Sequence, residues 1–221
     1  SALPLIAVTL GDPAGIGPEI VLKSAADPRV QRACRIIAIG DAQTLSLKNS
    51  RTPMKILPIL NPAQAKFNTG KLNVLHIPCP EYSGIEPGHP TAVTGEISAR
   101  SVTVSVELAL LKLVDAIVHA PISKYAWKLA GVHYPGHTEL IARLSNTKKY
   151  AMAITSEPLR TVMVTRHIPL SQVPRALTKT EITDTIELTY SWLKKICGRA
   201  TRLAVCALNP HAGEKGLIGT E

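Results

Sequence analysis

The chain has 221 residues, of which 45% are hydrophobic and 4% aromatic, and it carries a formal net charge of +9 at pH 7. This composition excludes a disordered chain and predicts a globular protein with an aliphatic core, in one large domain or two smaller ones. The positive charge favours a small anionic substrate. The basic residues are scattered and do not alternate with aromatic ones, which argues against nucleic-acid binding.

Cysteine usage and apolar runs indicate where the protein works. The four cysteines are far apart and form no CxxC or Cys/His cluster: Cys34, Cys79, Cys197 and Cys206. A reduced, intracellular protein fits this pattern. No segment has the layout of a signal peptide, and no apolar run reaches the ~18 residues that span a bilayer. We therefore expect a cytoplasmic protein without a membrane partner.

The first element in chain order is a strand at residues 5–10, followed by the glycine-rich sequence GDPAGIGPE at residues 11–19 and a helix at residues 20–26. Pro18 and Glu19 suit the first turn of that helix. Such a loop can bring backbone N–H groups close to an anion, but it contains neither GxGxxG nor a P-loop. By itself it is a weak phosphate motif.

Apolar runs and helical patterns then alternate along the chain, which is typical of a layered α/β protein. We expect further strands at residues 35–39, 115–120, 150–154, 161–165 and 203–208. We expect helices up to residue 47 and at residues 95–112, 140–144, 173–176 and 181–195. The proline-rich residues 51–90 predict irregular structure with short strands at 55–60 and 72–77.

The predicted helix at residues 95–112 carries serines at spacings of three and four along one side: Ser98, Ser101 and Ser105. Small side chains on one face of a helix usually permit close packing. A role of these serines in binding is the less favoured interpretation.

Two histidines follow predicted strands directly. His167 lies in Arg-His-Ile-Pro after residues 161–165, and His211 lies in Asn-Pro-His-Ala-Gly after residues 203–208. Ligands of open α/β sheets bind beyond the carboxyl ends of the strands, so we predict that both histidines bind one divalent metal. An isolated histidine in this position is more often a hydrogen-bonded loop residue. Two ligands are also fewer than the roughly three protein ligands of a catalytic zinc.

Two further segments place polar side chains beside predicted elements. Lys124 follows the strand at 115–120, where it is either a solvated helix-start residue, an anion ligand or an acid/base group. His137 and Thr138 lie near the start of a helix, where free N–H groups, a hydroxyl and an imidazole can converge on an anion. Alternatively, Thr138 is simply a capping residue.

Five motifs together closely resemble the 4-hydroxythreonine-4-phosphate dehydrogenase (PdxA) family of pyridoxal phosphate biosynthesis. In chain order they read GDPAGIGPE at residues 11–19, APISK at 120–124, PGHTE at 135–139, RHIPL at 166–170 and LNPHAGE at 208–214. The first also resembles the GDGIGPE loop of isocitrate and isopropylmalate dehydrogenases. The order and the spread of the motifs over almost the whole chain make the resemblance specific.

The resemblance implies an α/β fold like that of isocitrate and isopropylmalate dehydrogenases, with two α/β/α domains around a cleft. It implies a homodimer with a shared active site, within which residues 1–221 form an incomplete two-lobed subunit. The implied reaction is oxidation of 4-(phosphooxy)-L-threonine with NAD or NADP, followed by decarboxylation to 3-amino-2-oxopropyl phosphate.

The resemblance also implies roles for individual residues. His167 and His211 match metal ligands for zinc, cobalt, manganese or magnesium, His137 and Thr138 match substrate-binding residues, and Lys124 is the candidate catalytic residue. No residue for cofactor binding is identified. Family members continue for about 100 residues beyond the position of Glu221, with a third metal histidine, further substrate-binding residues and an HGTA-type segment associated with the nucleotide. His119 stands where relatives commonly have Thr.

Other functions remain open. The nearest keeps the fold and oxidises 4-phospho-threonate or 4-phospho-erythronate, although Pro135 before Gly136 favours the amino-acid phosphate. Another is an inactive fragment with only a binding role. An acyltransferase on the related phosphotransacetylase-like fold explains neither the two histidine motifs nor the glycine-rich loop.

Overall fold

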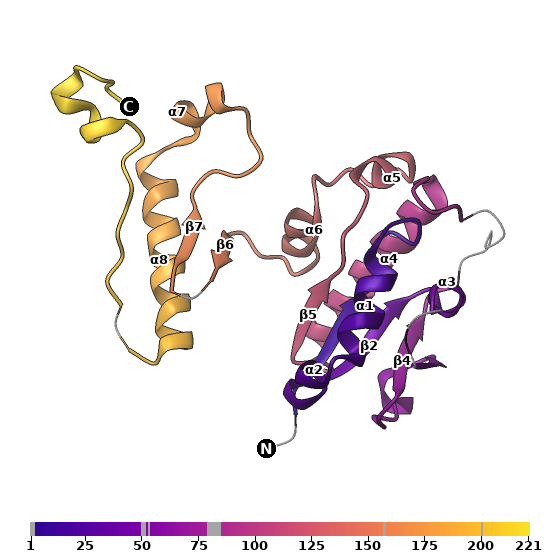
Figure 1. Ribbon diagram of the computed structural model, residues 1–221. Coiled ribbons are helices and arrows are strands. Elements are labelled where there is room, and N and C mark those ends of the chain that lie inside the picture. Colours follow the sequence, from indigo (N-terminus) through magenta and orange to yellow (C-terminus); the bar gives the residue numbers. More distant parts are fainter. Residues whose placement is uncertain (1–2, 50–51, 53, 79–84, 157, 200) are drawn as a thin grey trace. The chain divides into compact units, whose positions relative to one another are not determined.

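The computed structural model (Figure 1) describes residues 3–49, 52, 54–78, 85–156, 158–199 and 201–221, so Cys79 lies outside the described residues. The chain divides into two compact units, Ser1–Asn146 and Thr147–Glu221. Each unit has its own secondary structure, and each is described by itself.

The first unit contains the strands and helices expected for an α/β layer protein. Its strands are β1 (Leu5–Thr9), β2 (Arg35–Gly40), β3 (Lys55–Ile59), β4 (Lys71–His76) and β5 (Ala116–His119). Its helices are α1 (Gly17–Ala26), α2 (Pro28–Ala33), α3 (Ala42–Lys48), η1 (Pro62–Gln64), α4 (Ala92–Leu110), α5 (Lys124–Leu129) and α6 (His137–Leu144). These assignments confirm the strands expected near residues 5–10, 35–39 and 115–120.

The five strands form one sheet in the order β3-β4-β2-β1-β5, and every neighbouring pair is parallel. Parallel sheets are covered on both faces, so their central strands are apolar on both sides. In β2, Ala38 faces one core cluster while Ile37 and Ile39 face another. Residues 55–59 and 71–76 are therefore full members of the main sheet, although they lie in the proline-rich segment.

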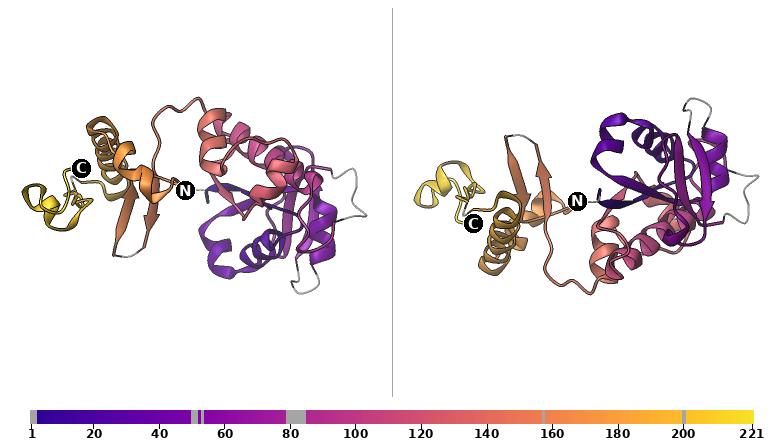
Figure 2. Two further views of the ribbon diagram at one scale, coloured as in Figure 1. Left: turned by 90° about the horizontal axis from the view of Figure 1, so that it is seen from above. Right: turned by 90° about the horizontal axis from the view of Figure 1, so that it is seen from below.

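Helices cover the two faces of this sheet separately. On one face, Val21 and Leu22 of α1 pack with Leu45 of α3, and on the other face α4 contributes Leu108. The left view of Figure 2 shows the indigo and purple helices on one side of the strands and the rose helices on the other. The unit is thus a three-layer α/β/α sandwich.

Helix α4 begins at Ala92, earlier than the expected start at Gly95, because Thr91 caps it. Thr91 Oγ1 accepts a hydrogen bond from Thr94 N at 3.3 Å, and Thr94 Oγ1 accepts one from Thr91 N at 3.0 Å. Gly95 therefore lies inside the helix, where a Cβ would overlap the carbonyl of Ala126 in α5. The serine face is fully buried and closely packed, as expected.

The second unit contains β6 (Met152–Thr155), β7 (Arg160–Met163), η3 (Leu170–Gln172), α7 (Val173–Ala176), α8 (Lys179–Cys197) and η4 (Pro210–Gly216). The antiparallel pairing of β6 with β7 confirms the expected strand pair. Thr178 caps the start of α8, and Gly198 ends it in the left-handed conformation at φ 66°. Helices α4 and α8 have 19 residues each, yet no helix in the described part of the chain has the length and apolar character needed to cross a bilayer.

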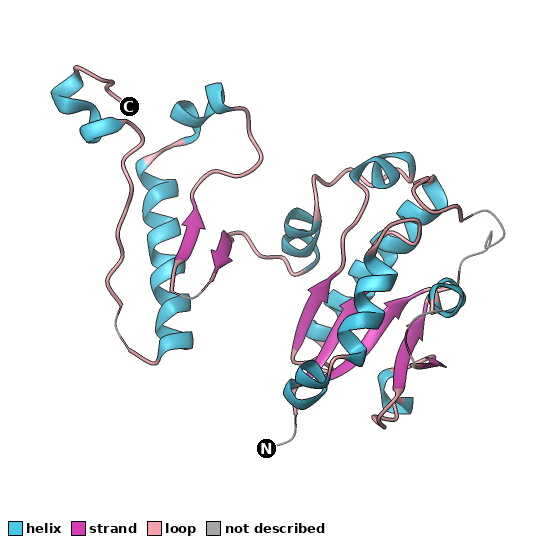
Figure 3. Ribbon diagram, viewed as in Figure 1, coloured by secondary structure: helices cyan, strands magenta, loops and turns pink. Residues whose placement is uncertain are grey.

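The expected strand at residues 203–208 is wrong. These residues form an irregular segment with Val205 64% exposed, which appears as the long pink loop after α8 in Figure 3. A strand requires backbone hydrogen bonds to a neighbour, and no strand of the described residues pairs with this segment. β-propensity alone did not determine its structure.

Candidate functional site

The glycine-rich loop after β1 packs against the segment after β5, because these parallel strands are neighbours and end at the same edge of the sheet. Asp12 N donates a hydrogen bond to Pro121 O at 3.0 Å. Gly11 has φ 69°, and a Cβ there would overlap the same carbonyl oxygen. Glycine is required for both reasons. Two of the motifs thus meet at the carboxyl edge of the sheet.

The side chains of Asp12, within the loop, and of Lys48, in α3, hold the glycine-rich loop by hydrogen bonds to its backbone. Asp12 is buried, and its Oδ1 accepts a hydrogen bond from Ala14 N at 2.9 Å. Lys48 Nζ donates to Pro13 O at 2.7 Å and to Gly15 O at 3.2 Å, and burial lowers the pKa of Lys48. Because the loop already contains a carboxylate, it is poorly suited to an external anion.

A pair of stacked histidines lies at the same edge of the sheet. His119, the last residue of β5, stacks on His137, the first residue of α6, with ring centroids 4.8 Å apart and planes inclined by 23°. Thr9 Oγ1 lies 3.1 Å from His119 Nδ1 across the β1–β5 pairing. Trp127 contacts the ring of His137 in a T-shaped arrangement, with the two ring centroids 5.8 Å apart.

Partial burial favours the uncharged form of both imidazoles. Desolvation, followed by repulsion from His137, lowers the pKa of His119 from 6.5 to about 4. Desolvation also lowers the pKa of His137. The Nε2 atoms of both rings are buried and have no hydrogen-bond partner among the described residues. Buried polar atoms are usually paired, so these two positions are candidates for contact with a ligand or water.

The start of α6 brings three of the residues selected from the sequence together. His137 and Thr138 are its first two residues, and Gly136, not Thr138, is the N-cap. Lys124 is the first residue of α5, exposed, and its Cε lies 3.9 Å from the position that a Cβ on Gly136 would take. A lysine, a hydroxyl and an imidazole therefore surround one helix amino terminus.

One histidine at this edge of the sheet was not selected from the sequence. His76 ends β4, and its Nδ1 accepts a hydrogen bond from Ala42 N at 3.2 Å and lies 3.7 Å from Asp41 Oδ1. The signal was present, since His76-Ile77-Pro78 repeats the His-Ile-Pro sequence that singled out His167. The bond from Ala42 N favours a structural role for this ring.

The two predicted metal ligands, His167 and His211, lie in the second unit. Both are exposed, and both have a positive φ, 49° and 52°, which is uncommon for residues other than glycine. Such strained backbone is often found at ligand sites. In the part of the chain that the structure describes, no three His, Cys, Asp or Glu residues are grouped so as to hold a metal ion. These two imidazoles therefore do not make a complete metal site by themselves.

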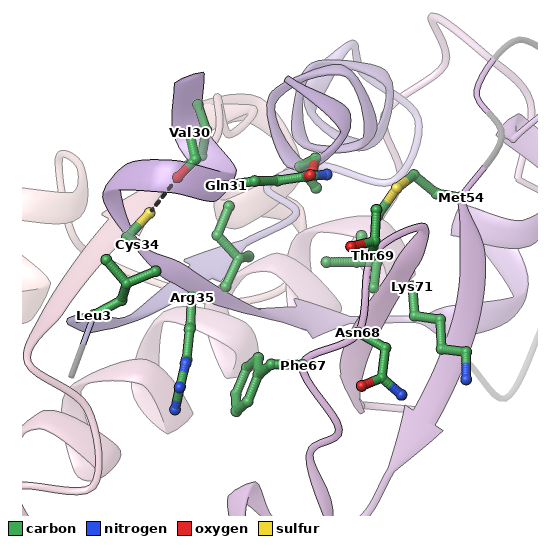
Figure 4. A pocket seen from close by; sticks show the side chains of 13 residues that line it. Leu3, Val30, Gln31, Cys34, Arg35, Met54, Phe67, Asn68, Thr69 and Lys71 are labelled. Carbon is green, nitrogen blue, oxygen red and sulfur yellow. Dashed lines mark hydrogen bonds between the residues drawn. The ribbon is translucent and has the colours of Figure 1, made fainter. Parts of the chain in front are cut away.

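A cavity of about 270 Å³ lies at the opposite, amino edge of the sheet (Figure 4). Arg35 begins β2 and Lys71 begins β4, and the guanidinium of Arg35 lies 5.3 Å from the ring centroid of Phe67. Ligands of open α/β sheets bind at the carboxyl edge. The candidate site is therefore the edge that carries Lys124, His119 and His137.

Comparison with known families agrees with this architecture. The model of the family described as "Pyridoxal phosphate biosynthetic protein PdxA" matches residues 32–221. The chain belongs to the PdxA family. Its PdxA motifs are the segments that converge at the carboxyl edge of the sheet and the two histidine segments of the second unit.

Relatives within the PdxA family carry two names. A 4-hydroxythreonine-4-phosphate dehydrogenase of Trichlorobacter lovleyi is 36% identical over 99% of the chain, which covers 66% of that protein. A D-threonate 4-phosphate dehydrogenase of Pectobacterium atrosepticum is 38% identical over 98% of the chain, which covers 67% of it. The chain thus spans about two thirds of the length of these relatives.

Solved structures of the PdxA family share the fold. The crystal structure of 4-hydroxythreonine-4-phosphate dehydrogenase from Klebsiella pneumoniae has a TM-score of 0.89 and 40% identity, covering 98% of this chain and 67% of that chain. The expected α/β fold is therefore confirmed over the part of the family fold that this chain represents.

Proposed function

We propose that this chain is part of a dehydrogenase that uses NAD or NADP to oxidise 4-(phosphooxy)-L-threonine and decarboxylate the product to 3-amino-2-oxopropyl phosphate, in pyridoxal 5'-phosphate biosynthesis. The observation that carries the proposal is the match of residues 32–221 to the PdxA family. A cytoplasmic homodimer with a shared active site belongs to the same proposal.

The start of α6 is the proposed binding site for the phosphorylated substrate. The first hydrogen bond of the helix runs from Leu140 N to Gly136 O, so the N–H groups of residues 137–139 have no acceptor within the helix. Such groups, with the positive end of the helix dipole, attract phosphate and carboxylate oxygens. His137 and Thr138 would add an imidazole and a hydroxyl to this site.

Lys124 is the proposed catalytic residue. Oxidation of the secondary alcohol sends a hydride to the nicotinamide and the hydroxyl proton to a base. Loss of carbon dioxide from the resulting β-keto acid leaves an electron pair on carbon, which takes up a proton. Lys124 would accept the first proton and would then hold the proton that the second step requires.

His167 and His211 are proposed as metal ligands, with zinc, cobalt, manganese or magnesium as the ion. A bound divalent ion supplies Lewis-acid stabilisation of negative charge on a substrate oxygen. Imidazoles suit transition metals such as zinc and cobalt better than they suit magnesium. Lys112, Asn146, Ala212, Glu214 and Lys215 share the positive φ of these histidines, so the assignment rests on the two sequence motifs and not on the backbone.

A second substrate is supported by the relative named D-threonate 4-phosphate dehydrogenase. Threonate carries a hydroxyl at the carbon where 4-hydroxythreonine carries an amino group, while the phosphate, the reacting alcohol and the carboxylate are shared. The two activities therefore require the same site residues and differ in the contact at one carbon.

The test is formation of NADH or NADPH by the purified chain with each phosphorylated substrate and a divalent metal. Turnover of 4-(phosphooxy)-L-threonine at a kcat/KM at least about tenfold above that of D-threonate 4-phosphate supports the first substrate, and the reverse order supports the second. No turnover of either, with phosphate still bound, contradicts a dehydrogenase function for this chain. That result would favour a role in binding alone.

Metal binding is tested on the same protein by calorimetric titration with zinc and manganese. We expect His167→Ala and His211→Ala each to weaken binding by at least about tenfold. The exposed His133, in the first unit, provides the matched control, and His133→Ala should bind metal like the unmodified chain. Equal affinity in all of these proteins would contradict the assignment.

A further inference from the structure

The hydrogen bonds of the described residues do not account for the stacked rings of His119 and His137. The two rings come from different elements, lie 4.8 Å apart, and leave both Nε2 atoms buried without a partner among the described residues. Two buried polar atoms without a described partner at the proposed substrate site require a physical reason.

The stacking geometry argues against a shared metal ion. The lone pair of an imidazole nitrogen lies in the plane of its ring, and the two planes are inclined by only 23°. The lone pairs of the two rings therefore lie in two separate, nearly parallel planes and do not converge on one ion. The two rings therefore pack against each other and do not bind one metal ion together.

His119 itself is rigidly held. It ends β5, its Nδ1 lies 3.1 Å from the hydroxyl of the fully buried Thr9, and Thr9 is its register partner in β1. His137, in contrast, is the first residue of the helix α6 and is not part of a paired strand. Among the described residues, the ring of His137 is stacked on His119 and makes a T-shaped contact with Trp127.

We propose that His119 is a positioning residue for His137, whose ring it fixes by stacking and keeps uncharged by excluding water, so that the substrate meets an oriented, neutral imidazole. This inference rests on the proposed substrate-binding role of His137. A neutral imidazole offers one N–H donor and one nitrogen acceptor, which suits a hydroxyl group of the substrate. An imidazolium would offer two donors and no acceptor.

Two ionisable side chains lie near the residue that precedes His137. Lys124 Cε and Glu139 Oε2 lie 3.9 Å and 3.7 Å from the position that a Cβ on Gly136 would take. Desolvation by burial is the cause that lowers the pKa of His137. A substitution at residue 119 therefore tests how much of this burial the ring of His119 provides.

The experiment compares two variants of the full chain. His119→Phe keeps a flat ring against His137 and removes the nitrogens, whereas His119→Ala removes the ring. The ring signals of His137 are followed by NMR during a pH titration without ligand. We expect the pKa of His137 to rise by about one unit in His119→Ala and to stay low in His119→Phe. His133→Ala is the control and should leave the His137 titration unchanged.

Kinetics with 4-(phosphooxy)-L-threonine provide the second readout. We expect KM to rise by about tenfold in His119→Ala with kcat within about twofold, and His119→Phe to restore KM. If His119→Ala does not fold, His119→Asn replaces it, since Asn can still bond Thr9 but has no ring. An unchanged His137 titration in the variant without a ring overturns the inference, as does a His119→Phe variant that behaves like His119→Ala. Absence of turnover in every protein bears on the proposed function, while the titration still decides the role of His119.

Discussion

The depressed pKa of His119 predicts that the first unit loses stability in mild acid. The folded protein holds this ring uncharged down to about pH 4, while the unfolded chain binds a proton near pH 6.5. The unfolded state therefore binds more protons in this window, so the free energy of unfolding falls as the pH falls. The stabilisation is fully present above pH 6.5 and is lost by about pH 4.

The size of this effect follows from the two pKa values. A fall in pKa from 6.5 to about 4 corresponds to at most about 3–4 kcal/mol of unfolding free energy for His119. His137, whose pKa is also lowered, acts in the same direction. Carboxyl groups contribute below about pH 5, so the comparison needs a variant that removes only one histidine.

The assay is urea unfolding at pH 7 and at pH 4.5, followed by the fluorescence of the buried Trp127 in a Trp192→Phe background. The chain has two tryptophans, so this background reports on the first unit alone. We expect His119→Phe to lose about 2 kcal/mol less than the parent between the two pH values. His133→Phe, at an exposed histidine, should lose as much as the parent. A His119→Phe variant with the full acid sensitivity of the parent would refute the reasoning.

The packing of α4 against α5 leads to two further predictions. Ser98 Oγ accepts the hydrogen bond of the buried Trp127 Nε1 at 2.8 Å, so Ser98→Ala should lower the free energy of unfolding by about 2 kcal/mol. Ser101 is equally buried, and among the described residues its Oγ donates to the carbonyl of Ile97 in its own helix, so Ser101→Ala should cost clearly less; equal losses in urea unfolding would contradict this reasoning. Gly95→Ala should destabilise by about 2 kcal/mol or more, despite the better helix propensity of alanine, because the backbone of Ala126 occupies the position of the new Cβ. A thermal midpoint equal to or above that of the parent would show that α5 can move away.

The sequence predicted the main sheet well because its strands are short apolar runs between turn residues. The strands β1, β2 and β5 began and ended within one or two residues of their expected bounds. The segment at 203–208 has the same kind of residues but forms no strand, because pairing is a property of the neighbours and not of the segment. The capped start of α4 was missed because the Thr91–Thr94 pair did not enter the prediction.

The candidate site was predicted only in part. The sequence identified His137, Thr138 and Lys124 by their positions beside elements, and the structure brings them to one helix amino terminus. It did not reveal the stack of His119 on His137, because the two residues belong to different elements and only tertiary packing determines that their rings meet. The metal role of His167 and His211 remains a prediction.

The pairing of β1 with β5 has a consequence for the order in which the protein folds during synthesis. Thr9 and His119 are register partners that lie 110 positions apart in the sequence. Strand β1 is synthesised before β2 and β5, so it can pair with β2 early, but its other edge stays open until β5 has been made. Such a long-range parallel contact is slow to form and leaves an unpaired edge exposed meanwhile. The stacked histidines can therefore assemble only near the end of folding of the first unit.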